Sequence, residues 1–308
     1  MVLKKMKNYG SLLRRCPLSR ENVIDAIVFE IVIPIFLFTV FFTPLNQNFA
    51  LHASNPTLYT IYFSNFAHAD ASHLTNNLTL YLISIYLILV LVMAFKVRSR
   101  KEFYFDMAII YLFIPFIISL YNIYLHPAQS ITAVFIGFSG IVAALIGYFV
   151  SLLFVLMYTK TGLKLSNLVF MACAVISINL ILLTILRYRA GFEEILTLTF
   201  LTFLCLMFVK KDIVHISSFV SSTLKNSLQH ENLYLLYLLL FFGILFPTVM
   251  ISLILWFSLF PDDLITDAGN NVNIYAHYIG YYLGILLPWI VYTIRSISKR
   301  WDLWLSLG

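Results

Sequence analysis

The chain has 308 residues, of which 61% are hydrophobic and 11% charged, and its formal net charge is +6. A soluble domain carries roughly 25% charged residues, so this composition excludes a water-soluble protein and predicts a chain embedded in a lipid bilayer. The Lys and Arg residues gather in short segments between apolar runs, where they set membrane topology, so the net charge does not indicate nucleic-acid binding. The three cysteines lie far apart, one in a basic segment and two in apolar runs, so we expect no disulfide and no metal cluster.

The N-terminal 22 residues form a basic segment, which predicts a cytoplasmic leader. Residues 23–308 then predict one all-α, polytopic transmembrane domain of about eight helices, since a spanning helix needs about 20 apolar residues. In the first of these helices, Pro34 indicates a kink. Between the sixth and seventh runs, residues 210–231 are polar and rich in Ser, which predicts a loop. The predicted helices cover residues 23–43, 73–95, 105–125, 139–158, 166–186, 194–209, 232–260 and 273–294.

The distribution of basic residues predicts the orientation of this domain. Eighteen of the 20 Lys and Arg residues lie in the leader, in alternate loops and in the tail. The other two, Arg187 and Arg189, are offset by Glu193 and Glu194. Because cytoplasmic loops carry the excess of positive charge, we expect a multi-pass cell-membrane protein with both termini in the cytoplasm. The second, fourth and eighth helices then start at a similar depth, just below the outer surface.

Ser139 lies between Gly137 and Gly140 at the start of the fourth predicted helix. A serine hydroxyl becomes a nucleophile when a neighbouring base accepts its proton. The glycines allow a tight turn and close approach of a substrate strand, and a helix start offers unpaired N–H groups to a developing oxyanion. The alternative is a small-residue packing site, in which Gly140 and Gly147 lie on a helix contact face.

His277 is the candidate base. It lies near the start of the last predicted helix, and Gly280 and Gly284 follow it. The Gly-x-x-x-Gly spacing allows close packing against another helix, and the fourth helix, with its own small residues, is the natural neighbour. Such close packing is what a direct serine–imidazole hydrogen bond needs. The alternative is a histidine that only bonds a nearby carbonyl.

A third polar group of residues opens the second predicted helix. His73 and Asn77 are spaced i, i+4 and share a face, and both can donate hydrogen bonds to an oxyanion while neutral. Capping and interface polarity are the structural alternative. A metal site built from His68, Asp70 and His73 is a further alternative, but it leaves Ser139 without a purpose.

Together these motifs resemble the rhomboid family of intramembrane serine proteases. The resemblance rests on three groups of residues: Gly137-Phe138-Ser139-Gly140 with Gly147, the series His68…His73…Asn77, and Ala276-His277 with Gly280 and Gly284. It implies a six-helix core, to which this chain adds about two transmembrane helices. The family has one helix between the serine and histidine helices, whereas this chain has three. We assign residues 232–260 as the core helix that gates substrate entry.

The resemblance also implies the chemistry. Ser139 is expected to be the nucleophile and His277 the base of a catalytic dyad. His73, Asn77 and the Ser139 N–H form the oxyanion hole, supported by His68, Gly137, Gly140, Gly280 and Gly284. The substrates implied are single-span membrane proteins cut near the outer leaflet, through an acyl-enzyme intermediate and with no cofactor. The tyrosine that the family often stacks on the histidine corresponds to Ala143 here.

Two other functions are consistent with the sequence. A non-enzymatic rhomboid relative would bind and sort membrane clients, but retention of both Ser139 and His277 argues against it. A transporter is suggested by the acidic residues Asp25 and Glu30 in the first predicted helix and by the extra helices. Ion- or substrate-coupled flux that does not depend on Ser139 would identify a transporter.

Overall fold

The computed structural model describes residues 19–93, 95–124, 134–161, 173, 192–228 and 276–290. These residues are mostly helical, and the described part of the chain contains four helices long and apolar enough to cross a membrane. This confirms the predicted class, an all-α membrane protein. The predicted leader before residue 19 and the predicted helices 166–186 and 232–260 lie outside the described residues, apart from Cys173. The four candidate spans are Arg20–Phe41, Ala71–Met93, Arg100–Tyr124 and Ser139–Leu156.

The first span consists of α2 (Arg20–Ala26), a π-helical stretch η1 (Ile27–Val32) and α3 (Ile33–Phe41). The wider helix precedes Pro34, which has no N–H to donate. In this stretch Ile33 N–H bonds to the Val28 carbonyl, five residues back, so the missing Pro34 N–H leaves the Phe29 carbonyl without its helical donor. The Tyr81 hydroxyl of a neighbouring helix donates to that carbonyl at 2.6 Å. The predicted irregularity at Pro34 is therefore a π-helical turn, stabilised from outside.

The connection to the second span is folded. It contains α4 (Leu45–Phe49), β1 (Leu51–His52), α5 (Leu58–Phe63) and the 3₁₀ turn η2 (Ser64–Phe66). Strand β1 pairs antiparallel with β2 (Val134–Phe135). This short pairing fixes the chain just before Gly137 against the connection.

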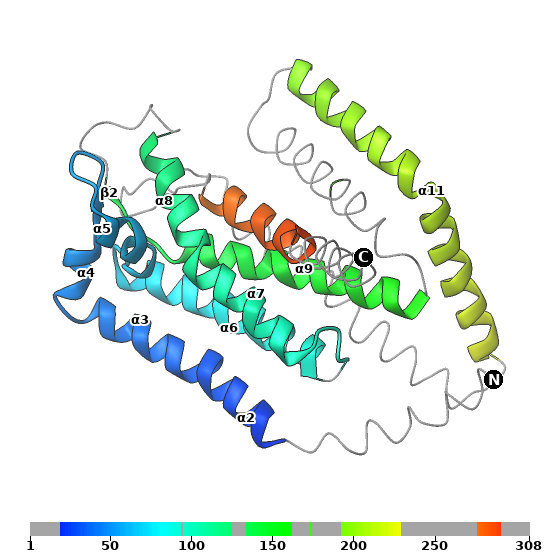
Figure 1. Ribbon diagram of the computed structural model, residues 1–308, viewed down its shortest axis with the longest axis horizontal. Helices are drawn as coiled ribbons and strands as arrows, with labels where there is room; N and C mark the ends of the chain where they lie inside the picture. The colour runs from blue at the N-terminus through cyan, green and yellow to red at the C-terminus, as the bar shows by residue number, and fades with distance from the viewer. Residues whose placement is uncertain are drawn as a thin grey trace, which may run out of the picture.

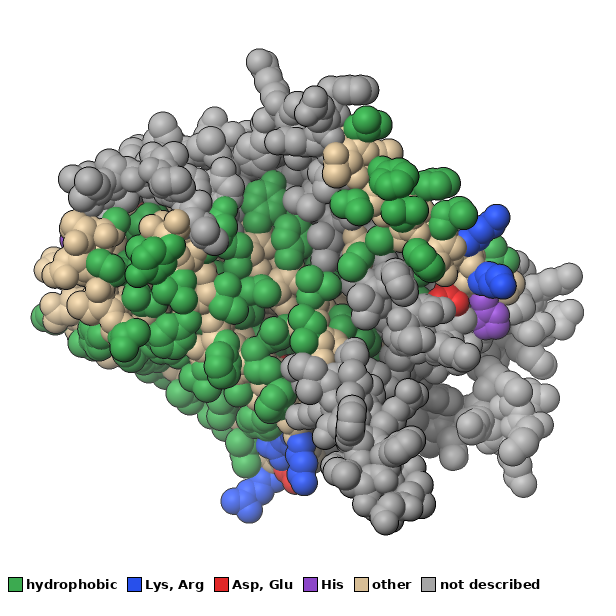
Figure 2. Space-filling model, turned by 45° about the horizontal axis from the view of Figure 1, so that its top comes forward, with side chains coloured by type: hydrophobic (Ala, Val, Ile, Leu, Met, Phe, Trp, Pro, Cys, Tyr) green, Lys and Arg blue, Asp and Glu red, His purple; other side chains and the backbone are tan. Residues whose placement is uncertain are grey.

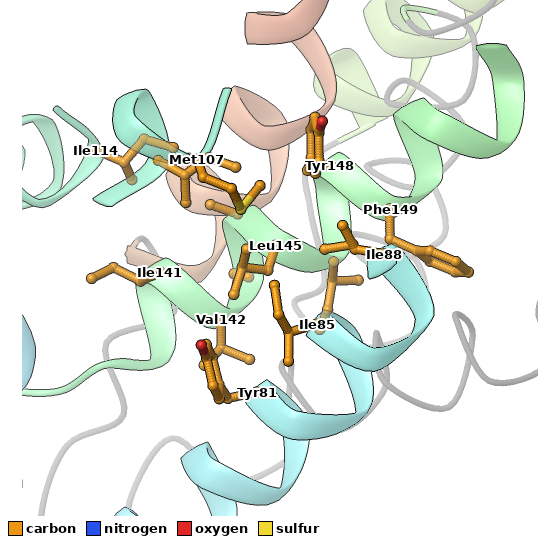
Figure 3. Close-up of a cluster of buried hydrophobic side chains, with 14 of the residues drawn as sticks. Tyr81, Ile85, Ile88, Met107, Ile114, Ile141, Val142, Leu145, Tyr148 and Phe149 are labelled. Carbon is orange, nitrogen blue, oxygen red and sulfur yellow. The ribbon is translucent and has the colours of Figure 1, made fainter. Parts of the chain in front are cut away.

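The core lies between α6 (Ala71–Met93) and α9 (Ser139–Thr161), which pack face to face. Figure 3 shows Tyr81 and Ile85 of α6 pointing toward Val142 and Leu145 of α9. These apolar side chains are fully buried, so α9 is enclosed by other helices. A polar group at its first residue can therefore be shielded from lipid.

The third span is divided into α7 (Arg100–Leu112) and α8 (Ile114–Tyr124). The sequence predicts a start near residue 105, but a capping box extends the helix backwards. Ser99 Oγ accepts from the Glu102 N–H at 3.3 Å, and Glu102 Oε2 accepts from the Ser99 N–H at 3.1 Å. This reciprocal pair satisfies two N–H groups that a helix start leaves unpaired.

The longest helix among the described residues is α11 (Phe192–Leu228), with 37 residues. The prediction of a loop over residues 210–231 is wrong as far as residue 228. This segment contains no Gly or Pro, so no helix-breaking residue interrupts the helix. The Ser and Lys residues make this part of the helix more polar in sequence than the part before it. Asp212, which is buried, accepts a hydrogen bond from the Tyr158 hydroxyl of α9 at 3.3 Å.

The last described helix covers residues 276–290 and lies alongside α9 (Figure 1). In Figure 1 this helix, α6 and α9 all begin on the same side of the molecule. Figure 2 shows a broad face of hydrophobic side chains, with charged side chains at its edges. Such a face suits contact with lipid. The three helix starts that carry the candidate site residues are therefore at one end of the bundle.

Candidate active site

The turn before α9 aims Ser139 at the end of the bundle. Gly137 has φ of +142°, a conformation that side chains rarely adopt, and its N–H donates to the Ser64 carbonyl at 3.1 Å. Phe138 is fully buried, with its ring centroid 5.8 Å from that of Phe66 and 5.5 Å from that of Tyr81. The buried ring anchors the turn, and Ser139 follows as the first, partly exposed residue of α9.

The start of α9 also offers backbone donors. The N–H groups of Ile141 and Val142 both bond to the Phe138 carbonyl, at 3.0 and 3.1 Å. Ser139 and Gly140 precede them, where an α-helix supplies no acceptor within itself. These two N–H groups are therefore placed to stabilise negative charge beside the Ser139 hydroxyl.

His73 lies next to this turn, in the first turn of α6. The Asp70 carboxylate caps the helix by accepting from the His73 N–H at 2.7 Å. A Cβ built on Gly137 would be 3.0 Å from His73 Cε1 and 3.7 Å from Ser139 Oγ. The His73 ring and the Ser139 hydroxyl therefore flank Gly137, and a side chain at this position would press against the His73 ring.

His68 supports His73 from behind. Asn46 holds the His68 backbone with two hydrogen bonds of 2.8 Å, one to each peptide group. The rings of His68 and His73 meet edge to face, with centroids 5.3 Å apart. His68 is fully buried, and a hydrogen bond with the Phe66 backbone favours the protonated ring. Burial, and then the neighbouring His73, lower the pKa of His68 to about 3, so its ring stays neutral.

Asn77 follows His73 by one helical turn on α6 and is 4% exposed. Its Nδ2 is buried, and within the described ranges no group accepts a hydrogen bond from it. Buried amides are normally bonded. An unpaired N–H donor at this position is consistent with a site that binds a transient acceptor.

This geometry does not support the alternative of a metal site. Asp70, which it requires as a ligand, is engaged as the cap of α6. Across the described ranges, no group of three or more His, Cys, Asp or Glu side chains is placed to hold a metal ion.

The helix 276–290 packs against α9 backbone to backbone, as the glycine spacing predicts. A Cβ built on Gly280 would overlap the Gly140 carbonyl oxygen, and one built on Gly284 would overlap that of Ala144. In the other direction, a Cβ built on Gly147 would overlap the Tyr281 carbonyl oxygen. Small residues on both helices are thus required along two turns of contact.

This contact places His277 at the level of Ser139. A Cβ on Gly140 would be 3.3 Å from the Ala276 carbonyl oxygen, and His277 is the next residue, 6% exposed. The structure thus brings the two helix starts together, and the Ser139–His277 dyad remains a prediction.

Packing also explains why position 143 is alanine. Ala143 is fully buried, and a Cβ on Gly280 would be 3.2 Å from its Cβ. A tyrosine at this position would push the two helices apart. Tyr278 and Tyr282 stack on each other at 5.9 Å along the last helix, one turn apart.

Sequence reasoning missed the residues that hold the connection in place. Asn65 Nδ2 donates to Ser119 Oγ at 2.9 Å and to the Pro115 carbonyl at 3.2 Å, and so ties η2 to α8. Asn46 holds His68 in a similar way. Asparagine in a polar loop gives no signal of such long-range bonds, whereas Asp70, three residues before the His73 N–H it caps, fits the known N-cap pattern. Comparison with protein-family models, curated proteins and solved structures found no match.

Proposed function

We propose that this chain is an intramembrane serine endopeptidase that cleaves single-span membrane proteins. The observation that carries the proposal is the backbone contact of Gly140 with Gly280, beside a turn where His73 and Ser139 flank Gly137. It brings a candidate nucleophile, base and oxyanion donors to one end of three apolar helices. The sequence resemblance to rhomboid proteases supports the same assignment.

The reaction follows from the roles of these groups. The Ser139 oxygen attacks the scissile carbonyl carbon while its proton passes to the His277 ring. The resulting oxyanion accepts hydrogen bonds from the Ser139 N–H, His73 and Asn77. The C–N bond then breaks, the amine leaves with the proton from His277, and the acyl group stays on Ser139. Water, deprotonated by His277, releases the carboxyl product and restores the serine.

The environment constrains the substrate. Helical peptide bonds are protected inside their helix, so the substrate span must unwind before it reaches Ser139. Helix-breaking or small residues near the cleavage point favour this step. The distribution of basic residues supports cleavage near the outer leaflet of the cell membrane, with both termini of the enzyme in the cytoplasm.

The test is cleavage of a single-span reporter by purified protein in liposomes. Ser139→Ala is expected to abolish cleavage, with a loss of at least roughly a thousandfold, while expression and thermal unfolding stay unchanged. Full activity in this variant would refute the assignment. If wild-type protein instead co-purifies with intact clients and yields no cleavage product, the alternative of a client-binding relative replaces it.

A further inference from the structure

A buried charge cluster contacts the helices that carry Ser139 and His277 more than two turns away from these two residues. Arg98, in the connection between α6 and α7, places its Nε 3.3 Å from Asp106 Oδ2 of α7, and both side chains are less than a tenth exposed. The same carboxylate oxygen accepts from the Tyr148 hydroxyl of α9 at 2.9 Å. Arg98 Nη2 donates to the Pro288 carbonyl of the last helix at 3.2 Å. We call these three side chains and this carbonyl the Arg98 cluster.

The cluster joins helices that belong to the candidate site. Tyr148 follows Ser139 by nine residues, and Pro288 follows His277 by eleven. At a rise of 1.5 Å per residue these separations are about 13 to 17 Å. The Arg98 cluster therefore fixes both helices more than two turns away from the hydroxyl and the imidazole. Figure 3 shows Tyr148 extending away from Tyr81 and Ile85 of α6.

The small residues in the contact between these two helices have no polar side chains. The contact is made by Gly140, Ala144 and Gly147 on one side and Gly280 and Gly284 on the other. Such surfaces pack closely through backbone contacts. The hydrogen bond from Arg98 to the Pro288 carbonyl adds a directional constraint on the position of the last helix.

The chemistry of the cluster also favours a positional role. Asp106 and Tyr148 alone would hold α7 against α9, and a buried ion pair adds little net stability because desolvation offsets its attraction. The guanidinium adds something else, since its fork of donors can bond a carboxylate and a carbonyl together. Only this second bond reaches the helix of His277.

We propose that Arg98 is a positioning residue that sets the register of the 276–290 helix on α9 and thereby the alignment of His277 with Ser139. For its catalytic consequence the proposal rests on the proposed function. The positioning of the 276–290 helix on α9 does not depend on that function.

The chain contains a matched control for each substitution. Arg100, two residues further on, pairs with Asp25 at 2.7 Å, and the Tyr104 hydroxyl donates to the same carboxylate. This second pair ties α7 to α2, and none of the bonds found for it among the described residues reaches α9 or the 276–290 helix. Tyr148→Phe and Tyr104→Phe remove the same group from the two places, as do Arg98→Ala and Arg100→Ala.

The kinetic readout separates positioning from binding. Tyr148→Phe and Arg98→Ala are expected to lower kcat about tenfold or more with KM within about twofold, because misalignment affects the chemical step. Arg98→Lys is expected to recover only part of this loss, since an ammonium lacks the fork. Tyr104→Phe and Arg100→Ala leave kcat unchanged.

The second readout does not require protease activity. In protein whose Cys16, Cys173 and Cys205 are replaced by serine, Ser139→Cys and His277→Cys are introduced together, and disulfide formation is timed under mild oxidation. The rate is expected to fall when Tyr148→Phe or Arg98→Ala is added and to hold with either control. If wild-type protein cleaves nothing but this rate falls, positioning stands and the proposed function fails. Unchanged rates with Tyr148→Phe, which leaves the ion pair intact, or equal losses in the controls, would overturn the proposal.

Discussion

The two ends of the helix bundle contain different kinds of buried polar side chain. At the Arg98 end, Asp106 is bonded by Arg98 and Tyr148, and Asp25 by Arg100 and Tyr104. At the Ser139 end the buried side chains are the neutral His68 and Asn77, and the Nδ2 of Asn77 has no partner among the described residues.

Buried polar groups in proteins are normally paired. Buried carboxylates that an arginine and a tyrosine both contact therefore mark a place where the chain holds itself together, and we interpret the unpaired amide of Asn77 as a donor available to a bound group. The predictions below test this contrast, starting with the contact that connects the two ends.

The largest effect is expected from Gly280→Val. The new side chain would overlap the Gly140 carbonyl and separate the last helix from α9. Cleavage of a reporter in liposomes is expected to fall at least about a hundredfold, because small displacements of catalytic groups are costly. Ile290→Val, at an exposed position of the same helix, is the control. Wild-type cleavage by Gly280→Val would contradict the packing.

The next effect tests the proposed oxyanion donors, His73 and Asn77. His73→Ala and Asn77→Ala are each expected to lower kcat about a hundredfold with little change in KM, as loss of an oxyanion donor does. Asn76 is exposed on the same helix, so Asn76→Ala is the matched control and should cleave normally. Equal losses for Asn76→Ala and Asn77→Ala would show that neither acts at the site.

A smaller effect is expected at the turn. Gly137→Ala would place a Cβ 3.0 Å from His73 Cε1 in a backbone conformation with φ of +142°. We expect a loss of about 1–3 kcal/mol in the free energy of unfolding from the strained backbone, with reduced kcat from the displaced ring. Denaturant titration in detergent micelles measures the first quantity and reporter cleavage the second. An alanine variant as stable and active as wild type would mean that the turn tolerates a side chain.

The effect that is smallest at neutral pH comes from His68. Since burial lowers the pKa of His68 to about 3 from its ordinary 6.5, the unfolded chain binds a proton between these values and the folded chain does not. Stability is therefore lost as pH falls from 6.5 toward 3, by at most about 1.4 kcal/mol per pH unit. His68→Gln removes this contribution, so its stability should depend less steeply on pH. The exposed His52 supplies the control, His52→Gln, and parallel profiles for wild type and His68→Gln would contradict the burial.

The helices were predictable where hydrophobic runs end at clear signals. The apolar run after Ser139 predicts the start of α9, and the first residue agrees. The sequence does not predict the extension of α11 past Val209, because a polar, Ser-rich stretch indicates a loop even where no Gly or Pro occurs. The early start of α7 follows from the Ser99–Glu102 capping box, a local signal hidden in a basic segment.

The candidate site is also predictable from the sequence only in part. The glycine spacing predicts the contact between α9 and the last helix, because close backbone approach depends on residue size alone. The bonds of Asn65 to α8 and of Arg98 to Pro288 join residues 50 and 190 positions apart. Such contacts depend on how the helices pack in space, and no local pattern encodes them.

The central claim is that the Ser139 hydroxyl and the His277 imidazole act as a pair. The direct measurement is labelling of purified wild-type protein with a fluorophosphonate probe, followed by mass spectrometry of the modified peptide. The account predicts an adduct on Ser139 that is lost in His277→Ala protein of unchanged thermal unfolding. A folded wild-type protein that takes no label at Ser139, or labelling that persists without His277, would contradict it.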